Sequence, residues 1–265
     1  MRWEHLTSPE FAEAVRETET CILPMGVIEK HSEHLPLGTD YLVVHRIACL
    51  AAEREPAVVF PWWYFGQVYN LRCFPGTVSI RPTLMLDLLL HIFDEIGRNG
   101  FRKIILHNGH GGNTSLVRFL TRCTMWEEKP YSVYLPNTWL TGERKAQADA
   151  ICETTQHEHA CECETSMSLA IHADLVKMAA VPDEPGTAQG RLKHLGDTYT
   201  GVSWISDYPR HYAGDARPAT IEKGRKLLQL HVDTLAEFIA AVKADTVTPV
   251  IQADFFKHAE NPVGE

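Results

Sequence analysis

The feature that most constrains the fold is a regular alternation of apolar runs with helical patterns. Strand-like runs lie near residues 20–25, 57–61, 103–107 and 131–136. Helical patterns lie near residues 40–54, 83–98, 113–127 and 164–180, and an amphipathic helix is expected over 221–242. Continuous apolar strands separated by helices are typical of a parallel sheet that is covered on both faces. The sequence therefore predicts an α/β fold, a single-domain parallel-sheet sandwich with helices on both faces, over residues 1–265.

Polar side chains follow the first predicted strand. Glu29 and His31 come soon after it, and Asp40 stands where the next helix is expected to begin. Side chains alternate with period two in an extended chain, so Glu29 and His31 are expected to project from the same side. Their oxygen and nitrogen donors suit zinc, manganese or iron. A polar surface loop is the simpler interpretation of an isolated Glu-x-His, but a second segment of the same kind favours a metal site.

The second segment follows the predicted strand at 103–107 and reads Asn108-Gly109-His110-Gly111-Gly112-Asn113. His110 stands between glycines and has little neighbouring bulk to pack on, which favours a ligand role over a core histidine. A strand, a Gly-rich turn and a helix can also hold phosphate on backbone amides. That interpretation is weaker, because neither Gly-Lys-Ser/Thr nor Gly-x-Gly-x-x-Gly is present.

The third segment, residues 157–166, holds two histidines, three glutamates and two cysteines within eight positions. A structural zinc site using Cys161, Cys163 and nearby histidines is one interpretation. It is disfavoured because Cys-x-Cys lacks the paired Cys-x2-Cys spacings of closed structural sites. A catalytic acid/base pair with a further metal carboxylate fits the segment better.

Taken together, these segments resemble the creatininase family of metal-dependent amidohydrolases. The matching text is Gly26-Val27-Ile28-Glu29-Lys30-His31, His34-Leu35-Pro36-Leu37-Gly38-Thr39-Asp40, Phe74-Pro75-Gly76-Thr77-Val78-Ser79, Asn108-Gly109-His110-Gly111-Gly112-Asn113, and Glu158-His159-Ala160 through Glu164-Thr165-Ser166. The helix start Glu222-Lys223-Gly224-Arg225 is also similar to the family. Five motifs in order along most of the chain are a specific signal.

The resemblance implies two divalent metals per subunit, zinc or manganese or both, with iron as a further option. Glu29, Asp40 and His110 would hold one metal, and His31 with Asp40 the second, so that Asp40 bridges them. Glu164 is the nearest carboxylate to complete the second set. The resemblance also implies that Glu158 and His159 shuttle the proton, and that Ser79 and Gly111 face the substrate.

The chain departs from the family's pattern at three places. Lys30 stands where the family usually has Gln. Gly111 and Gly112 stand where creatinine-hydrolysing members carry an aromatic residue and a Glu. Those members also place a Trp a few positions before the Glu-His pair, where this chain reads Thr154-Thr155-Gln156-His157. We therefore expect hydrolysis of a non-peptide C–N bond, in a cyclic or formyl-type amide of a small molecule, rather than of creatinine itself.

Composition narrows the class of protein further. The formal charge of −9 argues against nucleic-acid binding, which needs clustered Lys and Arg. Seven scattered cysteines do not suggest a disulfide framework and suit a reducing cytosol. We see no signal peptide and no apolar run of membrane-spanning length, so a cytoplasmic protein is expected. A homo-oligomer, hexameric by resemblance, is also expected.

Four points stay open at this stage, and three of them are alternative functions or mechanisms. The aperiodic segment near 182–218 is expected to form part of the active-site wall or a subunit contact. Catalysis by a serine or cysteine nucleophile is a rival mechanism, although no Gly-x-Ser-x-Gly elbow occurs. A metal-binding scaffold that has lost turnover is a rival from another class. Creatinine amidohydrolase proper is the third alternative.

Overall fold

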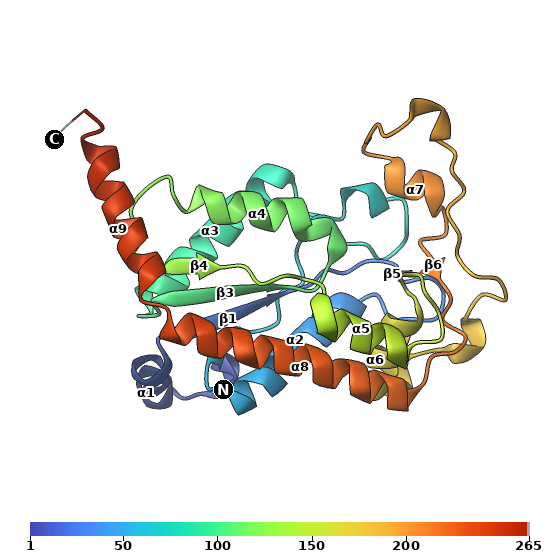
Figure 1. Cartoon of the computed structure of the whole chain (residues 1–265), viewed down its shortest axis with the longest axis horizontal. Coiled ribbons are helices and arrows are strands. Elements are labelled where there is room, and N and C mark those ends of the chain that lie inside the picture. Colours follow the sequence, from blue (N-terminus) through green and yellow to red (C-terminus); the bar gives the residue numbers. More distant parts are fainter. Residues whose placement is uncertain (264–265) are drawn as a thin grey trace.

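The central element is a four-stranded parallel sheet (Figure 1). Its strands are β1 (Thr20–Met25), β2 (Val58–Val59), β3 (Lys103–Asn108) and β4 (Ser132–Tyr134), in the order β2-β1-β3-β4. All three strand pairs are parallel. The structure is a computed structural model that describes residues 1–263. It confirms the predicted α/β class, and each strand lies within its predicted run or one residue beyond it.

Helices cover both faces of this sheet (Figure 1). The α-helices are α1 (Ser8–Thr18), α2 (Thr39–Arg54), α3 (Pro82–Arg98), α4 (Thr114–Cys123), α5 (Gly142–Ile151), α6 (Glu162–His172), α7 (Ser203–Asp207), α8 (Ile221–Ala244) and α9 (Val247–Glu260). Short 3-10 helices lie at Trp3–His5, Tyr69–Leu71, Gly111–Asn113, Ala173–Leu175, Met178–Ala180 and Lys193–Leu195. On one face, α1, α3 and α4 pack on the sheet, and α2, α6 and α8 pack on the other.

The alternation of side chains along the strands explains the continuous apolar runs. In β1, Leu23 packs with α3 and α4, while Ile22 packs with α2 and α8. In β3, Leu106 and Ile105 divide between the same two clusters. Because successive side chains point to opposite faces, a strand that is covered on both faces must be apolar at every position.

Several elements were not predicted from the sequence. They are α1, α5, α7, α9 and a small antiparallel pair of β5 (His157–His159) with β6 (Ala213–Gly214). For α1 a signal was present, since Thr7 and Glu10 form a capping box in which each side chain meets the other's backbone. The β5–β6 pair joins residues more than fifty positions apart, and short strands of this kind leave no periodic pattern.

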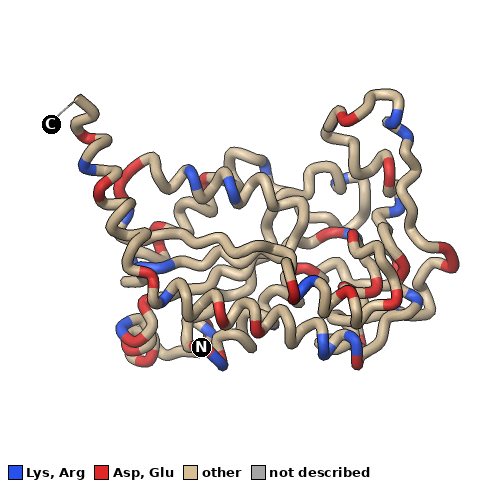
Figure 2. The backbone as a smooth tube through the Cα atoms, viewed as in Figure 1, with Lys and Arg blue, Asp and Glu red and all other residues tan. Residues whose placement is uncertain are grey.

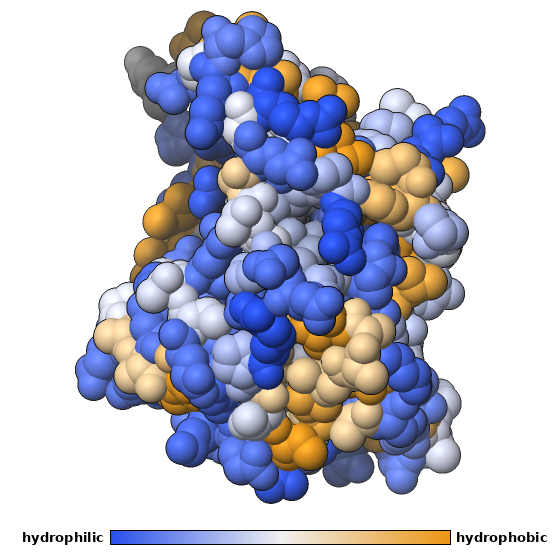
Figure 3. All heavy atoms as spheres, turned by 90° about the vertical axis from the view of Figure 1, so that its right-hand side faces the viewer, coloured by the Kyte–Doolittle hydropathy of each residue, from blue (hydrophilic) through white to orange (hydrophobic). Residues whose placement is uncertain are grey.

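The candidate site lies beyond the carboxyl ends of β1 and β3, at the end of the molecule where α7, β5 and β6 gather (Figure 1). This end is largely hydrophilic on its surface, with smaller hydrophobic patches (Figure 3). Lys and Arg are dispersed among Asp and Glu along the chain rather than gathered into one stripe (Figure 2). Within residues 1–263, no helix has both the length and the apolar character needed to cross a membrane.

Candidate metal and catalytic site

The loops after two neighbouring parallel strands bring the predicted ligands together. Glu29 and His31 follow β1, His110 follows β3, and Asp40 lies in the first turn of α2. All four side chains are buried. Gly26 allows α2 to approach this closely, because a Cβ there would lie 2.3 Å from the backbone nitrogen of Tyr41.

The carboxylate of Asp40 lies between two imidazoles. Its Oδ1 is 3.0 Å from Nε2 of His31, and its Oδ2 is 3.0 Å from Nδ1 of His110. An oxygen of Glu29 lies 3.3 Å from the same Nδ1 of His110 and 3.8 Å from Nε2 of His31. Asp40 is therefore placed so that each of its oxygens faces a different histidine, as a bridging ligand requires.

Backbone carbonyls orient the rings of these histidines. His31 Nδ1 lies 3.3 Å from the Glu29 carbonyl oxygen, and His110 Nε2 lies 3.1 Å from the Gln67 carbonyl oxygen. A carbonyl only accepts hydrogen bonds, so these nitrogens carry the protons. In the neutral ring, the opposite nitrogen presents its lone pair to the carboxylates. This is the usual arrangement of metal-ligating histidines, in which a backbone acceptor fixes the tautomer.

The buried carboxylates need a positive charge in the site. Both carboxylate oxygens of Glu29 and Oδ2 of Asp40 are buried without a hydrogen-bond donor among the described residues. Burial alone would lower the pKa of His31, but Asp40 and Glu29 outweigh it and raise that pKa to about 9. Buried charges in proteins are paired or coordinate metals. The donor set therefore fits a divalent cation, which would supply the charge with the histidines neutral.

Two groups of ligand atoms are compact enough to hold an ion. Glu29, Asp40 and His110 form one, and His31, Asp40 and Glu164 form the other, with all donor atoms of a group within 4.8 Å of one another. They share Asp40. A third grouping, Glu29 with His31 and His159, overlaps both. We call Glu29, His31, Asp40, His110 and Glu164 the central site.

Two further positions shape the site, namely the carboxylate of Glu164 and the space at Gly112. Glu164 lies in the first turn of α6, where its carboxylate accepts a hydrogen bond from the backbone N–H of Ala160. Burial raises the pKa of Glu164 to about 8, and the neighbouring Cys161 adds to the shift. At Gly112, a Cβ would lie only 2.4 Å from Nε2 of His110. A larger residue at 112 would therefore require the His110 ring to move.

The two residues predicted to be catalytic, Glu158 and His159, lie on β5. His159 is buried, and its Nδ1 is 3.8 Å from the Glu29 carboxylate, while its Nε2 is 3.0 Å from the Lys30 carbonyl oxygen. Burial lowers the pKa of His159 well below its usual range, and the neighbouring His31 and His211 rings add to this. The ring is therefore neutral near pH 7 and can accept a proton at Nδ1. Glu158 is exposed and lines the cavity described below.

Lys30 contributes to the site through its backbone. Its carbonyl accepts the hydrogen bond from His159, while its side chain pairs with Glu33 at 2.8 Å. The ammonium also lies 5.0 Å from the centre of the Phe74 ring. The Lys30 side chain is thus engaged with Glu33 and Phe74.

His211 is a site residue that the sequence did not reveal. The indole N–H of Trp204 donates to Nδ1 of His211 at 2.7 Å, so the proton of the neutral ring is on Nε2. That Nε2 lies 3.6 Å from the Glu29 carboxylate, and the ring centroid is 3.7 Å from that of His159. His211 is therefore placed as a hydrogen-bond donor. It belongs to the aperiodic segment near 182–218, where no motif marked it.

A cavity of about 480 Å³ opens onto these groups. Its walls come from segments far apart in the sequence, with the side chains Gln67, Asn70, Trp139, Tyr199, Ser203, Trp204, Asp207 and Tyr208 among them. Part of the 182–218 segment therefore forms a wall of this cavity, which is one of the two roles expected for it from the sequence. Gly111 lines the cavity, whereas Ser79 is not among its lining residues.

Aromatic side chains line the cavity although none follows the Gly109-His110 pair. A Cβ on Gly111 would lie 3.4 Å from the Trp139 ring, so Trp139 occupies the space beside that glycine. Trp204 lies edge-on to His159, with ring centroids 6.1 Å apart. Tertiary contacts therefore bring two tryptophans to this side of the site from other segments of the chain.

Comparison with known proteins places these features in context. The family model described as "Creatininase: Creatinine amidohydrolase" matches residues 4–239. The chain is similar to a 3-dehydro-scyllo-inosose hydrolase of Thermotoga maritima, with 25% identity over 89% of this chain and 82% of the relative. A creatinine amidohydrolase of Pseudomonas putida is 26% identical over 82% of this chain and 87% of the relative. A mycofactocin precursor peptide peptidase of Mycobacterium ulcerans is 27% identical over 83% and 84% of the two chains.

Solved structures share the fold. A creatinine amidohydrolase (creatininase) structure superposes with a TM-score of 0.78 and 24% identity, covering 92% of this chain and 98% of that one. A creatininase structure described as the Mn form has a TM-score of 0.77, with 24% identity over 92% of this chain and 99% of that one. Each of the three relatives carries a name that describes a hydrolase.

Proposed function

This chain belongs to the creatininase family, and we propose that it is a metal-dependent amidohydrolase that cleaves a non-peptide C–N bond. The proposed substrate is a small molecule with a cyclic or formyl-type amide. The observation that carries the proposal is the position of Asp40 between two oriented imidazoles, beside a neutral His159. The cavity volume of about 480 Å³ falls in the range of small-molecule sites.

We assign the metal ligands from the two compact groups. Glu29, Asp40 and His110 would hold one divalent ion, and His31, Asp40 and Glu164 the other. The unpartnered oxygens of Glu29 and Asp40 support this assignment. Zinc and manganese are the proposed metals, and iron suits the same donors. When bound, such ions lower the proton affinity of water and polarise a substrate carbonyl.

His159 is the proposed proton carrier. Its Nε2–H is held by the Lys30 carbonyl, which leaves Nδ1 free on the side of Glu29. There it can take a proton from the attacking water and return it to the nitrogen that leaves when the amide bond breaks. Glu158, on the same strand at the cavity, is proposed to act with it as the partner acid and base. His211 would offer its Nε2–H as a donor beside them.

The test is hydrolysis by the zinc- or manganese-loaded protein of a panel of lactams, cyclic imides, formamides and short peptides. We expect turnover of one or more small amides and none of the peptides. His159→Ala should abolish that turnover while metal content stays unchanged. His258→Ala is the matched control, because His258 is exposed on α9. Metal binding with no turnover of any amide would instead favour the scaffold alternative, and peptide cleavage alone would overturn the non-peptide class.

We also propose that the protein assembles with copies of itself. Apolar side chains at 247, 250, 251 and 255 are exposed along α9, at a spacing that places them on one side of the helix. The helix projects from the body of the molecule (Figure 1). Light scattering during size-exclusion chromatography would measure the assembly directly, and a monomer at micromolar concentration would contradict it.

A further inference from the structure

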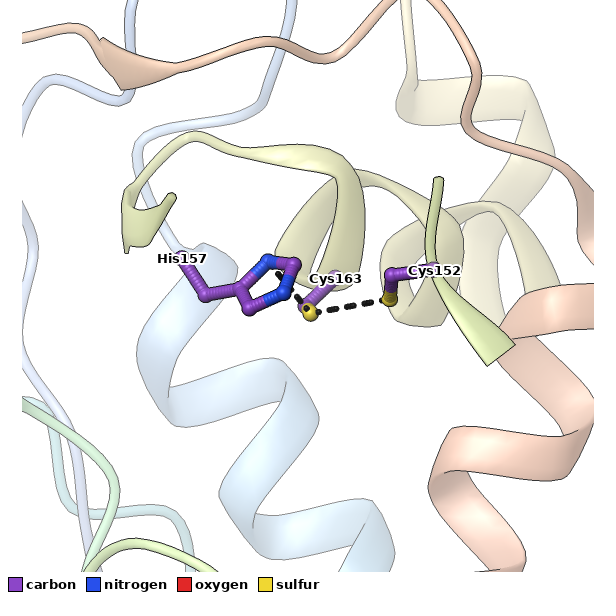
Figure 4. Close-up of side chains that lie close together, drawn as sticks. All are labelled: Cys152, His157 and Cys163. Carbon is purple, nitrogen blue, oxygen red and sulfur yellow. Dashed lines mark hydrogen bonds between the residues drawn. The ribbon is translucent and has the colours of Figure 1, made fainter. Parts of the chain in front are cut away.

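Two cysteines and a histidine form a second cluster outside the central site. The sulfur of Cys163 lies 3.3 Å from the sulfur of Cys152 and 3.2 Å from Nδ1 of His157 (Figure 4). All three donor atoms lie within 4.8 Å of one another. We call this set the cysteine–histidine cluster. It shares no residue with the central site.

The cluster joins three elements that lie next to the catalytic residues. Cys152 is the C-cap of α5, His157 begins β5, and Cys163 is in the first turn of α6. His157 is followed directly by Glu158 and His159, and Cys163 is followed directly by Glu164. An ion bound by the cluster would therefore hold in place both the start of β5, which carries Glu158 and His159, and the start of α6, which carries Glu164.

The backbone around the cluster is already held in place. The buried carboxylate of Glu162 accepts hydrogen bonds from the backbone N–H groups of Glu153 and Thr154, at 3.0 and 2.8 Å. It also pairs with the ammonium of Lys223 on α8 at 2.6 Å. This ties the loop that follows Cys152 to the helix that carries Cys163. The donors therefore meet on a rigid frame, which favours binding because little order is lost.

The donor types select a different metal from the central site. Thiolates with imidazole prefer thiophilic ions such as zinc, whereas the central site offers carboxylates and imidazoles. Two Zn–S bonds of about 2.3 Å at a tetrahedral angle place the sulfurs about 3.8 Å apart. The observed 3.3 Å is about half an ångström short of that. A disulfide would need about 2.05 Å between the sulfurs and would leave His157 without a role.

We propose that Cys152, His157 and Cys163 form a further metal site, which takes a thiophilic divalent cation, zinc above all. All three residues are partly exposed, so an ion can reach them from solvent. The site is a structural clamp that holds β5 and the start of α6 against the end of α5. The sequence pointed to Cys161 and Cys163. Cys163 belongs to the cluster and Cys161 lies beside it, while Cys152, eleven positions before Cys163, was not expected there.

The test uses cobalt as a spectroscopic substitute for zinc in the chelator-treated, reduced protein. Only thiolate ligands give an intense sulfur-to-cobalt charge-transfer band in the near ultraviolet, so the central site does not contribute one. We expect this band in the wild-type protein, and its loss in both Cys152→Ser and Cys163→Ser. Zinc per chain should fall by one equivalent in each variant. Cys73→Ser, at an exposed cysteine outside the cluster, should leave the band and the zinc content unchanged.

The design separates this site from the central one. Asp40→Ala should keep the charge-transfer band even where it loses the central metals, so failure of the amidohydrolase proposal would leave this result intact. If Cys163→Ser does not fold, Cys152→Ser at the end of α5 gives the same readout. Absence of the band in wild type, its survival in both serine variants, or a Cys152–Cys163 disulfide in protein kept under reductant would each overturn the proposal.

Discussion

At the scale of single residues, backbone carbonyls orient three histidines at and beside the central site. The carbonyls of Glu29, Gln67 and Lys30 each hold one ring proton of His31, His110 and His159, and the other ring nitrogens turn toward the carboxylates. None of these acceptors could be recognised in the sequence, because a backbone carbonyl is present at every position. The ligand types were readable from the chain, while their tautomers depend on the fold.

Asp40 offers the sharpest test of the two-metal arrangement. Asp40→Ala should lose both ions together, because its two oxygens face both histidines. Elemental analysis after gel filtration measures this directly. Glu33→Ala is the control, since Glu33 is an exposed acid on the same loop and should retain full metal. Retention of both ions by folded Asp40→Ala protein would show that Asp40 does not bridge.

Glu164 makes a prediction about pH. In chelator-treated protein, burial raises the pKa of Glu164 to about 8 from an unfolded value of 4.5. Between these values the folded state binds a proton that the unfolded state releases, so stability falls as pH rises through this window. Glu164→Gln should flatten that fall, measured as urea midpoints from about pH 5 to about pH 8. His31, whose pKa is raised to about 9, adds a fall at higher pH in both proteins. Equal pH dependence in the two proteins would contradict the assignment.

At the scale of elements, the sequence predicted the helices and strands whose apolar residues recur at a regular spacing, and it missed most of the others. The strand runs and α2, α3, α4 and α8 carry apolar periodicity, and the structure has them close to the predicted bounds. The helix expected over 164–180 stops at His172, where 3-10 turns follow. His211 and Cys152 were missed for another reason. Each reaches its cluster through tertiary packing, which no local pattern encodes.

The contact between α6 and α8 depends on Gly224. A Cβ there would lie 1.8 Å from the backbone oxygen of Ser166, so α8 would have to move away from α6. Overpacking of this kind costs roughly 1–3 kcal/mol, which outweighs the better helix propensity of Ala. Gly224→Ala should lower the melting temperature and weaken metal binding at Glu164, which α6 carries. Gly201→Ala, where the added Cβ meets open space, is the control, and equal melting of both variants would contradict the close contact.

At the scale of the whole molecule, the cavity is assembled from segments that no single motif contains. The proposed metal ligands come from the ends of the parallel sheet and from α6, while Trp139 and the lining residues between Tyr199 and His211 come from later segments. The sheet therefore fixes the hydrolytic groups, and the loops fix what can reach them. Two members of one family can share the groups positioned by the sheet and differ in the surrounding loops. Family membership therefore constrains the type of reaction more tightly than it constrains the identity of the substrate.

This separation leads to the last prediction, which concerns creatinine. The chain has Gly111 and Gly112 where creatinine-hydrolysing members are expected to carry an aromatic residue and a Glu, and its tryptophans, Trp139 and Trp204, enter from other segments. A misplaced aromatic wall forfeits roughly 1.5–3 kcal/mol of packing, which is about ten- to a hundredfold in affinity. Creatinine turnover should therefore fall short of an authentic creatininase by at least that factor, assayed side by side with the same metals. Equal rates would mean that rings supplied by different loops can build the same substrate site.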